Sequence, residues 1–262
     1  MTDRPHDIEA PENRDFVTAF ARGLAVIEAF SPENKTMTLA EVAARTGVDR
    51  AVARRLLLTL VELGFAHVHQ RRFELTTRVL RLAYSFLSSA GIGASLQPFL
   101  DGLARSVGET VSLAVLDEAE VVFVARSDIP GRRLAYVVTT GMRLPAFSAA
   151  SGRVLLAQQP RAGVARLLAQ TKITRLTRHT VMSKRDISAM IDQALRDGHA
   201  INFQEIEEDL VSASVPVSNR AGLVVAALNV STSASRSSEA RMKKELLPKL
   251  KETASALAGM LP

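Results

Sequence analysis

The sequence contains no cysteine. Disulfide bonds, thiolate metal sites and cysteine nucleophiles are therefore excluded, and stability must come from packing alone. The N-terminal segment is polar and acidic and lacks the apolar core of a signal peptide. No later segment approaches the roughly 18 uninterrupted apolar residues that a membrane span requires. These absences predict a soluble protein of the reducing cytoplasm that has no membrane partner.

Repeats and low-complexity blocks are also missing, so ordinary globular domains are expected. The 262 residues, 47% of them hydrophobic, are enough for two folded units. The net charge of +6 is unevenly distributed along the chain. Residues 1–34 contain 3 basic and 7 acidic side chains, whereas residues 35–81 contain 9 basic and 4 acidic ones. This local excess of positive charge predicts an anionic partner for residues 35–81.

Helix signals follow a polar tail, residues 1–14, that is expected to be disordered. Residues 16–30 place apolar side chains at helical spacing and predict a first helix. Thr38 and Glu41 have the spacing of a capping box, which predicts a short second helix. Gly47 supplies a permissive backbone where that helix must stop.

A third helix is predicted to start after Asp49, which can cap it, and to end at Gly64. Two helices joined by a turn of about three or four residues that contains glycine have the spacing of a helix-turn-helix. Residues 65–75 form two short alternating runs around Gln-Arg-Arg, which predicts a β-hairpin. A hairpin directly after a helix-turn-helix is a wing.

The predicted third helix has a basic face. Arg50, Ala51, Arg54 and Arg55 fall within an arc of roughly 140 degrees, whereas Ala53, Leu56, Leu57, Leu60 and Leu63 take the opposite side. A solvated charged face is the ordinary interpretation of such a pattern. In a recognition helix beside a basic wing, DNA binding is favoured, because arginine can bind guanine edges or clamp phosphates.

Ala51 and Arg54 are the candidates for base reading, and the other arginines for backbone contacts. The full set of candidate DNA contacts is Thr38, Arg50, Ala51, Arg54, Arg55, Arg71 and Arg72.

The second half predicts an antiparallel sheet flanked by helices, so the fold class is α+β. Short turns separate its first three strands, and a parallel sheet would need longer crossovers. The predicted strands are 110–116, 120–127, 134–140, 199–206, 210–218 and 223–231. The predicted helices are 96–108, 151–157, 161–169, 184–197 and 239–260, and Ser183 and Asp186 have capping-box spacing before the fourth of them.

Three other motifs could carry chemistry. His67 and His69 share a strand face but lack a third ligand, so no metal is assigned. Ser148 and Ser151 lack the context of a nucleophile, and helix capping is the safer role for them. The acidic run 205–209 could hold paired carboxylates or a cation, but a solvated loop is favoured. No catalytic residue and no cofactor is assigned.

Three stretches resemble parts of IclR-family transcriptional regulators. The helix-turn-helix is matched by TLAEVAARTGVDRAVARRLLLTLVELGF, the first effector-domain signature by LPAFSAASGRVLLA, and the closing hairpin by VSASVPVSNRAGLVVAALNVS. The similarity covers about residues 15–260. RDFVTAFARGLAVIEAF together with RLPAFSAASGRVLLA is similar to the branch that controls aromatic-acid catabolism, including the protocatechuate and 4-hydroxybenzoate regulators of the β-ketoadipate pathway.

After the tail (1–14), the resemblance implies three segments. They are a winged helix-turn-helix (15–76), a linker helix (77–94) and a GAF-like effector-binding domain (95–262). It also implies dimers or tetramers on operator DNA, controlled by a small carboxylate or aromatic acid.

The family's effector pocket carries over to polar positions and to an apolar wall. The family often has an acidic residue where Asn202 stands, a cysteine where Ser212 stands, and a glycine where Asp209 stands. Hydroxyl and amide donors on adjacent strands can bind a carboxylate, although they could instead only satisfy hydrogen bonds at strand edges. The candidate effector residues are Leu144, Ala146, Ala149, Asn202, Ser212, Asn229 and Ser231.

The predicted function is a ligand-responsive transcriptional regulator. A small-molecule enzyme with an appended DNA-binding segment is the alternative, and a constitutive DNA-binding protein without an effector is a third possibility.

Overall fold

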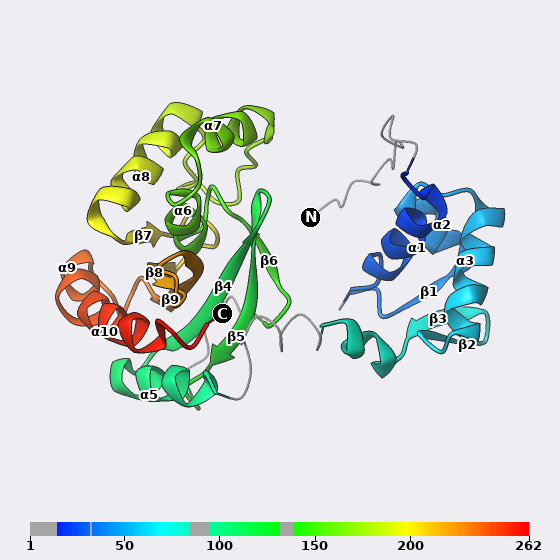
Figure 1. Cartoon of the computed structure of the whole chain (residues 1–262), viewed down its shortest axis with the longest axis horizontal. Coiled ribbons are helices and arrows are strands. Elements are labelled where there is room, and N and C mark those ends of the chain that lie inside the picture. Colours follow the sequence, from blue (N-terminus) through cyan, green and yellow to red (C-terminus); the bar gives the residue numbers. More distant parts are fainter. Residues whose placement is uncertain (1–14, 32, 84–94, 132–138, 262) are drawn as a thin grey trace. The chain divides into compact units, whose positions relative to one another are not determined.

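The computed structural model describes residues 15–31, 33–83, 95–131 and 139–261. The chain divides into two compact units, with the division between residues 86 and 87, and each unit is described by itself (Figure 1). The tail 1–14 lies outside the described residues, as do most of the predicted linker helix 77–94 and most of the predicted strand 134–140. The described start of the linker is a 3-10 turn, Thr77–Val79, that leads into a helical segment.

The first unit is a helix-turn-helix with a small antiparallel sheet of strand order β1-β3-β2. Its main core contains Val26 of the first helix, Val42 of the second, Leu57 of the third and Phe73 of the hairpin. All three helices and the hairpin therefore contribute to one core. The elements are α1 (Thr18–Glu28), β1 (Thr36–Thr38), α2 (Leu39–Thr46), α3 (Arg50–Glu62), β2 (Ala66–His69) and β3 (Arg72–Leu75).

Local capping fixes the ends of α2 and α3 as the sequence predicts. The Thr38 hydroxyl accepts from the Glu41 N–H at 3.3 Å, and the Glu41 carboxylate accepts from the Thr38 N–H at 2.6 Å. Asp49 accepts from the Ala51 N–H at 2.7 Å, and Gly47 has the left-handed φ of 66°. The predicted winged helix-turn-helix is therefore confirmed.

Two details of the first unit differ from the prediction. Leu63 was placed on the core side of α3 but is 52% exposed, because it follows the last helical residue and leaves the core-facing side. Strand β1 was not predicted, since three residues are too short for a periodic signal. It pairs with β3 through Thr36, Met37 and Thr38, and so adds a third strand to the wing sheet.

The second unit is a six-stranded antiparallel sheet of order β6-β5-β4-β9-β8-β7, which confirms the predicted α+β class. Its strands are β4 (Thr110–Asp117), β5 (Glu120–Ser127), β6 (Arg143–Pro145), β7 (Ala200–Phe203), β8 (Leu210–Ser218) and β9 (Val224–Ser233). Its helices are α5 (Gln97–Val107), α6 (Ala150–Leu156), α7 (Arg161–Gln170), α8 (Lys184–Asp197), α9 (Glu239–Arg241) and α10 (Leu247–Leu257). A π-helical segment, Met242–Leu246, joins α9 to α10, so the predicted closing helix forms with this irregularity.

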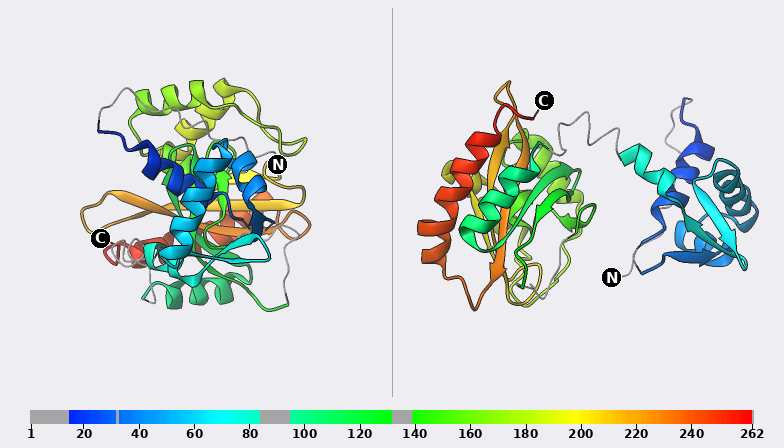
Figure 2. Two further views of the ribbon diagram at one scale, coloured as in Figure 1. Left: turned by 90° about the vertical axis from the view of Figure 1, so that its right-hand side faces the viewer. Right: turned by 90° about the horizontal axis from the view of Figure 1, so that it is seen from below.

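Helices cover both faces of this sheet. Helices α5 and α10 lie side by side on one face, as Figures 1 and 2 show, and they share a core with alternate residues of β8 and β9 such as Val211 and Leu228. Helices α6 and α8 pack in a second core that includes Ala114 and Ala227. Because strand residues alternate between faces, Asn229 and Ser231 of β9 lie on the α6 face.

Helix α6 approaches the chain that precedes it very closely at Gly152. A Cβ atom on Gly152 would lie 2.1 Å from the carbonyl oxygen of Ala146. All seven residues of α6 are buried, and Ala149 is its N-cap without any side-chain capping bond. The prediction that Ser148 and Ser151 cap this helix is therefore wrong, because Ser148 precedes the N-cap and Ser151 lies within the helix.

The contact of Gly152 predicts a selective loss of stability. Gly152→Ala should destabilise the second unit by about 1–3 kcal/mol, the usual range for overpacking, because backbone atoms block the added methyl group. Gly163→Ala is the matched control in α7, where a Cβ meets nothing within 4 Å, and alanine should be neutral or slightly stabilising there. Urea unfolding of both variants measures the difference. Equal midpoints for the two variants would contradict the close contact.

Candidate functional site

The outer face of α3 is a row of unpaired arginines. Arg50, Arg54 and Arg55 are exposed, as is Ala51, whereas Ala53 and Leu57 are fully buried. Within the described part of the chain, none of these three guanidinium groups makes a hydrogen bond or an ion pair. The predicted separation of a basic face from a core face is present, and the basic face is free to meet an anion.

The wing turn has an unusual backbone. Gln70 and Arg71 join β2 to β3, and both have left-handed φ angles, 47° and 64°. This geometry is that of a two-residue hairpin turn, which favours Asn and Gly at these positions. Two non-glycine residues in this region cost about 1 kcal/mol or more each. The turn holds Arg71 exposed at the tip, where it has no partner among the described residues.

Arg72 and Thr38 make contacts inside the unit. The Arg72 side chain donates to the Thr36 hydroxyl at 3.1 Å and to the Thr36 carbonyl at 2.8 Å, and it pairs with Glu41 at 3.2 Å. Arg72 therefore ties the wing to β1 and to the start of α2, a role that the sequence did not indicate. The Thr38 hydroxyl is engaged as the cap of α2.

The α6 face of the large sheet carries a row of polar side chains. Ser214 lies opposite Asn229, Asn229 opposite Ser112, and Ser112 opposite Arg126. Residues directly opposite in antiparallel strands share a face, so Ser214, Asn229, Ser112 and Arg126 form one polar row across β8, β9, β4 and β5. Only Asn229 of this row was a predicted site residue. The others were missed because single strands give no indication of their cross-strand partners.

A neighbouring row on the same face contains three of the predicted effector residues. Asn202 lies opposite Ser212, Ser212 opposite Ser231, and Ser231 opposite Thr110. The Asn229 amide donates to the Ser231 hydroxyl at 2.9 Å, and its oxygen accepts from Ser214 at 2.7 Å. These bonds use one N–H of Asn229 and leave the other available.

Asn202 is engaged in a buried network. Its amide nitrogen donates to the Ser148 carbonyl and to Glu205 at 3.3 Å, and its oxygen accepts from the Glu205 N–H at 3.2 Å. Both of its N–H groups are thus used inside the protein, and Asn202 positions its neighbours more than it offers donors to a ligand.

Arg153 and Glu205 form a buried ion pair at the centre of this network. The guanidinium binds the carboxylate with two bonds of 2.6 and 2.7 Å, and its Nε donates to the Phe147 carbonyl. Glu205 also accepts from the Val181 N–H at 3.2 Å. The expectation of a solvated acidic loop is therefore wrong for Glu205, because a buried arginine partner offsets its desolvation. An arginine within the small and apolar run of α6 was the signal in the sequence.

Asp209 explains a departure from the family pattern. Its φ of 64° is the left-handed conformation that favours glycine, and aspartate tolerates this region better than most residues. Its carboxylate accepts from the Ser233 hydroxyl at 2.6 Å and from the Ser235 N–H at 3.2 Å. The Ser233 bond is the largest of the effects that hold the pKa of Asp209 below its usual value. The loop thus has a conformation suited to glycine although aspartate occupies it.

The predicted apolar wall is also buried on the α6 face. Leu144, Ala146 and Ala149 belong to the core that contains α6 and α8. The backbone N–H of Ala146 donates to the Ala119 carbonyl at 2.8 Å, which fixes this segment against the sheet. The structure thus places the wall and both polar rows on the same side of the sheet.

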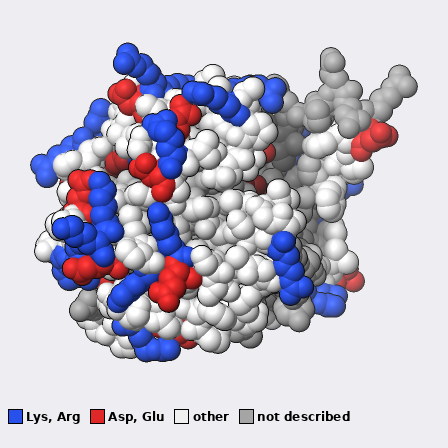
Figure 3. Space-filling model, turned by 60° about the vertical axis from the view of Figure 1, so that its left-hand side comes forward, with Lys and Arg blue, Asp and Glu red and all other residues white. Residues whose placement is uncertain are grey.

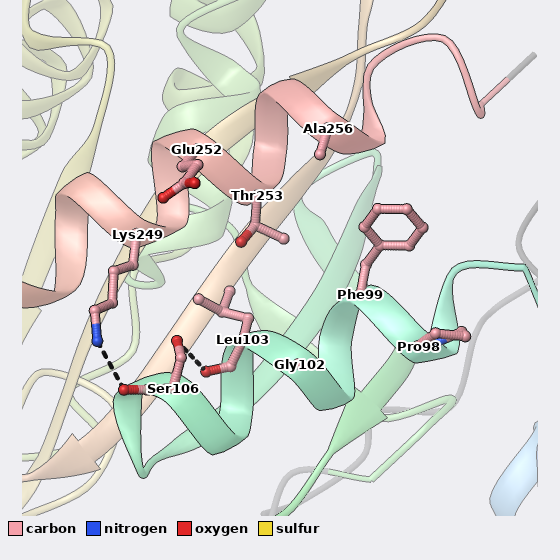
Figure 4. Close-up of a pocket in the computed structure, with 9 residues that line it drawn as sticks. All are labelled: Pro98, Phe99, Gly102, Leu103, Ser106, Lys249, Glu252, Thr253 and Ala256. Atoms are coloured by element: carbon pink, nitrogen blue, oxygen red, sulfur yellow. Dashed lines mark hydrogen bonds between the residues drawn. The ribbon is translucent and has the colours of Figure 1, made fainter.

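A separate groove lies on the opposite face of the sheet, between α5 and α10. It has a volume of about 440 Å³. Phe99, Leu103 and Ala256 line it, and Lys249 donates to the Ser106 carbonyl at 2.7 Å, as Figure 4 shows. The sheet separates this groove from the candidate effector residues.

Elsewhere in the described residues, acidic and basic side chains form ion pairs. On the face in Figure 3, acidic and basic side chains are intermixed. Ion pairs join Lys243 to Glu239 and Arg241 to Glu245. Among the described residues, no three His, Asp or Glu side chains are grouped to hold a metal. His67 instead contacts Glu74 at 3.4 Å. No helix in the described ranges is long and apolar enough to cross a membrane.

Comparisons with known proteins agree with this architecture. The IclR helix-turn-helix domain matches residues 19–69, and the C-terminal domain of bacterial IclR transcriptional regulators matches residues 84–258. The chain therefore belongs to the IclR family of transcriptional regulators.

Three relatives are informative. The chain is 35% identical to the Pca regulon regulatory protein of Pseudomonas putida, over 89% of this chain and 80% of that protein. It is also 35% identical to the p-hydroxybenzoate hydroxylase transcriptional activator of Acinetobacter baylyi, over 98% and 96%. The inducer-binding domain of a PobR double mutant from Acinetobacter, solved with 3-hydroxybenzoic acid, is 31% identical, with a TM-score of 0.60 over 63% of this chain and 97% of that chain.

The buried ion pair yields a stability prediction. Arg153→Met should destabilise the second unit by about 3–5 kcal/mol, because Glu205 would be left buried without a cation. The double variant Arg153→Met/Glu205→Leu should recover much of that loss. Arg161→Met is the control, because Arg161 forms an exposed pair with Asp192, and exposed pairs contribute little. Thermal and urea unfolding measure all three. A double variant no more stable than Arg153→Met would count against a charge-based explanation.

Proposed function

We propose that this chain regulates genes of aromatic-acid degradation by binding operator DNA through α3 and the wing, under the control of an aromatic or other small carboxylate. The observation that carries the DNA-binding part is the row of exposed, unpaired arginines on α3. In winged helix-turn-helix proteins this helix enters the major groove. Arg54 and Ala51 read bases, and Arg50, Arg55 and Arg71 contact the backbone. Arg72 supports the wing from inside the unit.

The effector part of the proposal is supported by the buried polar rows and by the relatives. Hydroxyl and amide donors lie beside the apolar wall, a combination that suits a small ring with a carboxylate. Two relatives are named for the Pca regulon and for p-hydroxybenzoate hydroxylase, and the PobR domain was solved with 3-hydroxybenzoic acid. An effector regulates DNA binding if it has different affinities for two arrangements of the protein.

A homodimer or tetramer on a pseudo-palindromic operator completes the proposal. Val17, the N-cap of α1, and Phe20 and Leu24 on that helix are exposed, and their spacing places them on one side of it. An apolar stripe of this kind supports pairing between copies of the chain. Such a regulator acts in the cytoplasm, where its DNA is.

The alternative is an enzyme that uses the second unit for turnover. Ser148 and the carboxylates of residues 205–209 were its candidate groups. The Glu205 carboxylate is bound by Arg153, and among the described residues no His forms a hydrogen bond with Ser148, so the geometry supports regulation instead. An effector recovered chemically unchanged after incubation with the protein would oppose the enzyme; its conversion to product would favour it.

DNA binding can be tested by replacing the base-reading and the backbone-contacting arginines separately. On a duplex selected by the wild-type protein from random sequences, Arg54→Ala should lose about 1–3 kcal/mol of binding free energy and relax preference at one position. Arg71→Ala should weaken selected and scrambled DNA alike and reduce the salt slope by about 1. Arg185→Ala on α8 removes an exposed charge from the second unit and is the control. If Arg54→Ala bound the selected duplex as tightly as the wild type, the assignment of the reading face would be wrong.

Effector binding can be tested by thermal shift of the full chain. Protocatechuate, 4-hydroxybenzoate, β-ketoadipate and small keto acids form the panel. A ligand at about 100 times its Kd stabilises the native state by about 2.7 kcal/mol, so the midpoint should rise for the effector. A protein that no carboxylate stabilises would instead be the constitutive DNA-binding protein.

A further inference from the structure

Arg126 is a largely buried cation on the sheet face that carries the candidate effector residues. It lies on β5, opposite Ser112, in the same polar row as Asn229. Its side chain is only 12% exposed. Neither the family resemblance nor the sequence patterns pointed to this residue.

Two of the three guanidinium nitrogens of Arg126 have a hydrogen-bond partner. Its Nε donates to Asp128 at 2.7 Å, and Nη2 also binds that carboxylate. The Thr110 hydroxyl of β4 donates to the same carboxylate at 3.0 Å. This bond places the Arg126–Asp128 pair beside the Thr110 end of β4.

The remaining terminal nitrogen, Nη1, is buried and has no hydrogen-bond partner in the part of the chain that the structure describes. Buried N–H groups are nearly always paired, because leaving one unpaired carries the full cost of its desolvation. Guanidinium presents donors on more than one edge, so the pair with Asp128 leaves capacity for a second anion.

Burial raises the pKa of Asp128, but hydrogen bonds from Arg126 and Thr110 and the charge of Arg126 outweigh this effect, so its pKa lies below the ordinary value. Asp128 is therefore ionised near neutral pH and remains the partner of Arg126. A ligand carboxylate does not need to displace it, because Nη1 is still available.

The general spacing of strands leaves room for a carboxylate between Arg126 and Asn229. Strands β5 and β9 are separated by β4 alone, so their backbones are roughly 10 Å apart. Between them the row has the small side chain of Ser112. Asn229 has one N–H left for a ligand, and a charged donor on the other side makes the stronger bond to a carboxylate.

We propose that Arg126 binds the carboxylate of the effector through Nη1, with the free N–H of Asn229 as the second donor and Ser112 beneath it. This inference rests on the proposed function and deepens it, because it assigns the residue that recognises the carboxylate of a ligand whose ring or chain lies on the apolar wall. The neutral donors of the two rows then orient the ligand, and Arg126 selects for its negative charge.

The test compares an acid with its uncharged amide. Isothermal titration of the full chain with 4-hydroxybenzoate and 4-hydroxybenzamide is carried out for the wild type, Arg126→Met, Arg126→Lys and Arg143→Met. Arg143 is the control, because it pairs with Asp117 and Glu120 at the exposed edge of the same sheet. Circular dichroism and the thermal midpoint establish that each variant is folded.

We expect Arg126→Met to lower the affinity for the acid by about ten-fold or more, since a hydrogen bond to a charged group is lost. The amide should change by less than about two-fold, Arg126→Lys should restore part of the affinity for the acid, and Arg143→Met should match the wild type.

Any of four results would overturn it. Unchanged affinity of Arg126→Met for the acid would remove Arg126 from the site while the proposed function stands. If Arg126→Met lost affinity for the acid and for the amide equally, the role of Arg126 would be structural. The same would follow if Arg126→Met did not fold and Arg126→Lys recovered no affinity for the acid. A wild-type protein that binds neither this acid nor the other carboxylates of the thermal-shift panel would reject the proposed effector function together with this inference.

Discussion

The bidentate pair between Arg153 and Glu205 organises the second unit around its candidate site. It joins α6 to the loop after β7, and its outer bonds reach the Phe147 carbonyl and the Val181 N–H. Through Asn202 it also fixes the Ser148 carbonyl. Four separate segments thus share one buried charge pair, so no one of them can shift without breaking hydrogen bonds in a low-dielectric interior. A site framed in this way holds its donors in fixed positions.

The two faces of the large sheet have different chemistry for a topological reason. The strands that cross its centre alternate Val or Leu with Ser, Thr or Asn, so one face packs entirely on α5 and α10. The other face has polar groups beneath α6, and some of them form hydrogen bonds with one another. In the first unit the same separation is made on a single helix, since α3 buries Ala53 and Leu57 and exposes its arginines. Both candidate sites are therefore the polar sides of elements whose apolar sides build the cores.

Local signals predicted much of the fold, and contacts between distant residues could not be predicted in the same way. The caps at Thr38 and Asp49 and the ends of α8 at Ser183 and Asp197 follow from nearby residue types, and the structure confirms them. Arg72 was grouped with Arg71 because the two are adjacent, yet its partners are Thr36 and Glu41, more than thirty residues away. The burial of Glu205 and the position of Arg126 were not predicted for the same reason, because they depend on tertiary packing and on strand register.

The central claim is that a small carboxylate bound in the second unit controls DNA binding by the first. The most direct test is the operator affinity of the full chain. It is measured by fluorescence anisotropy with and without a saturating concentration of an acid that raises the thermal midpoint. The account predicts a change of about five-fold or more in the Kd for DNA. By linkage, the Kd for the acid must change by the same factor when DNA is saturating. Identical DNA affinity with and without a bound acid would contradict the account.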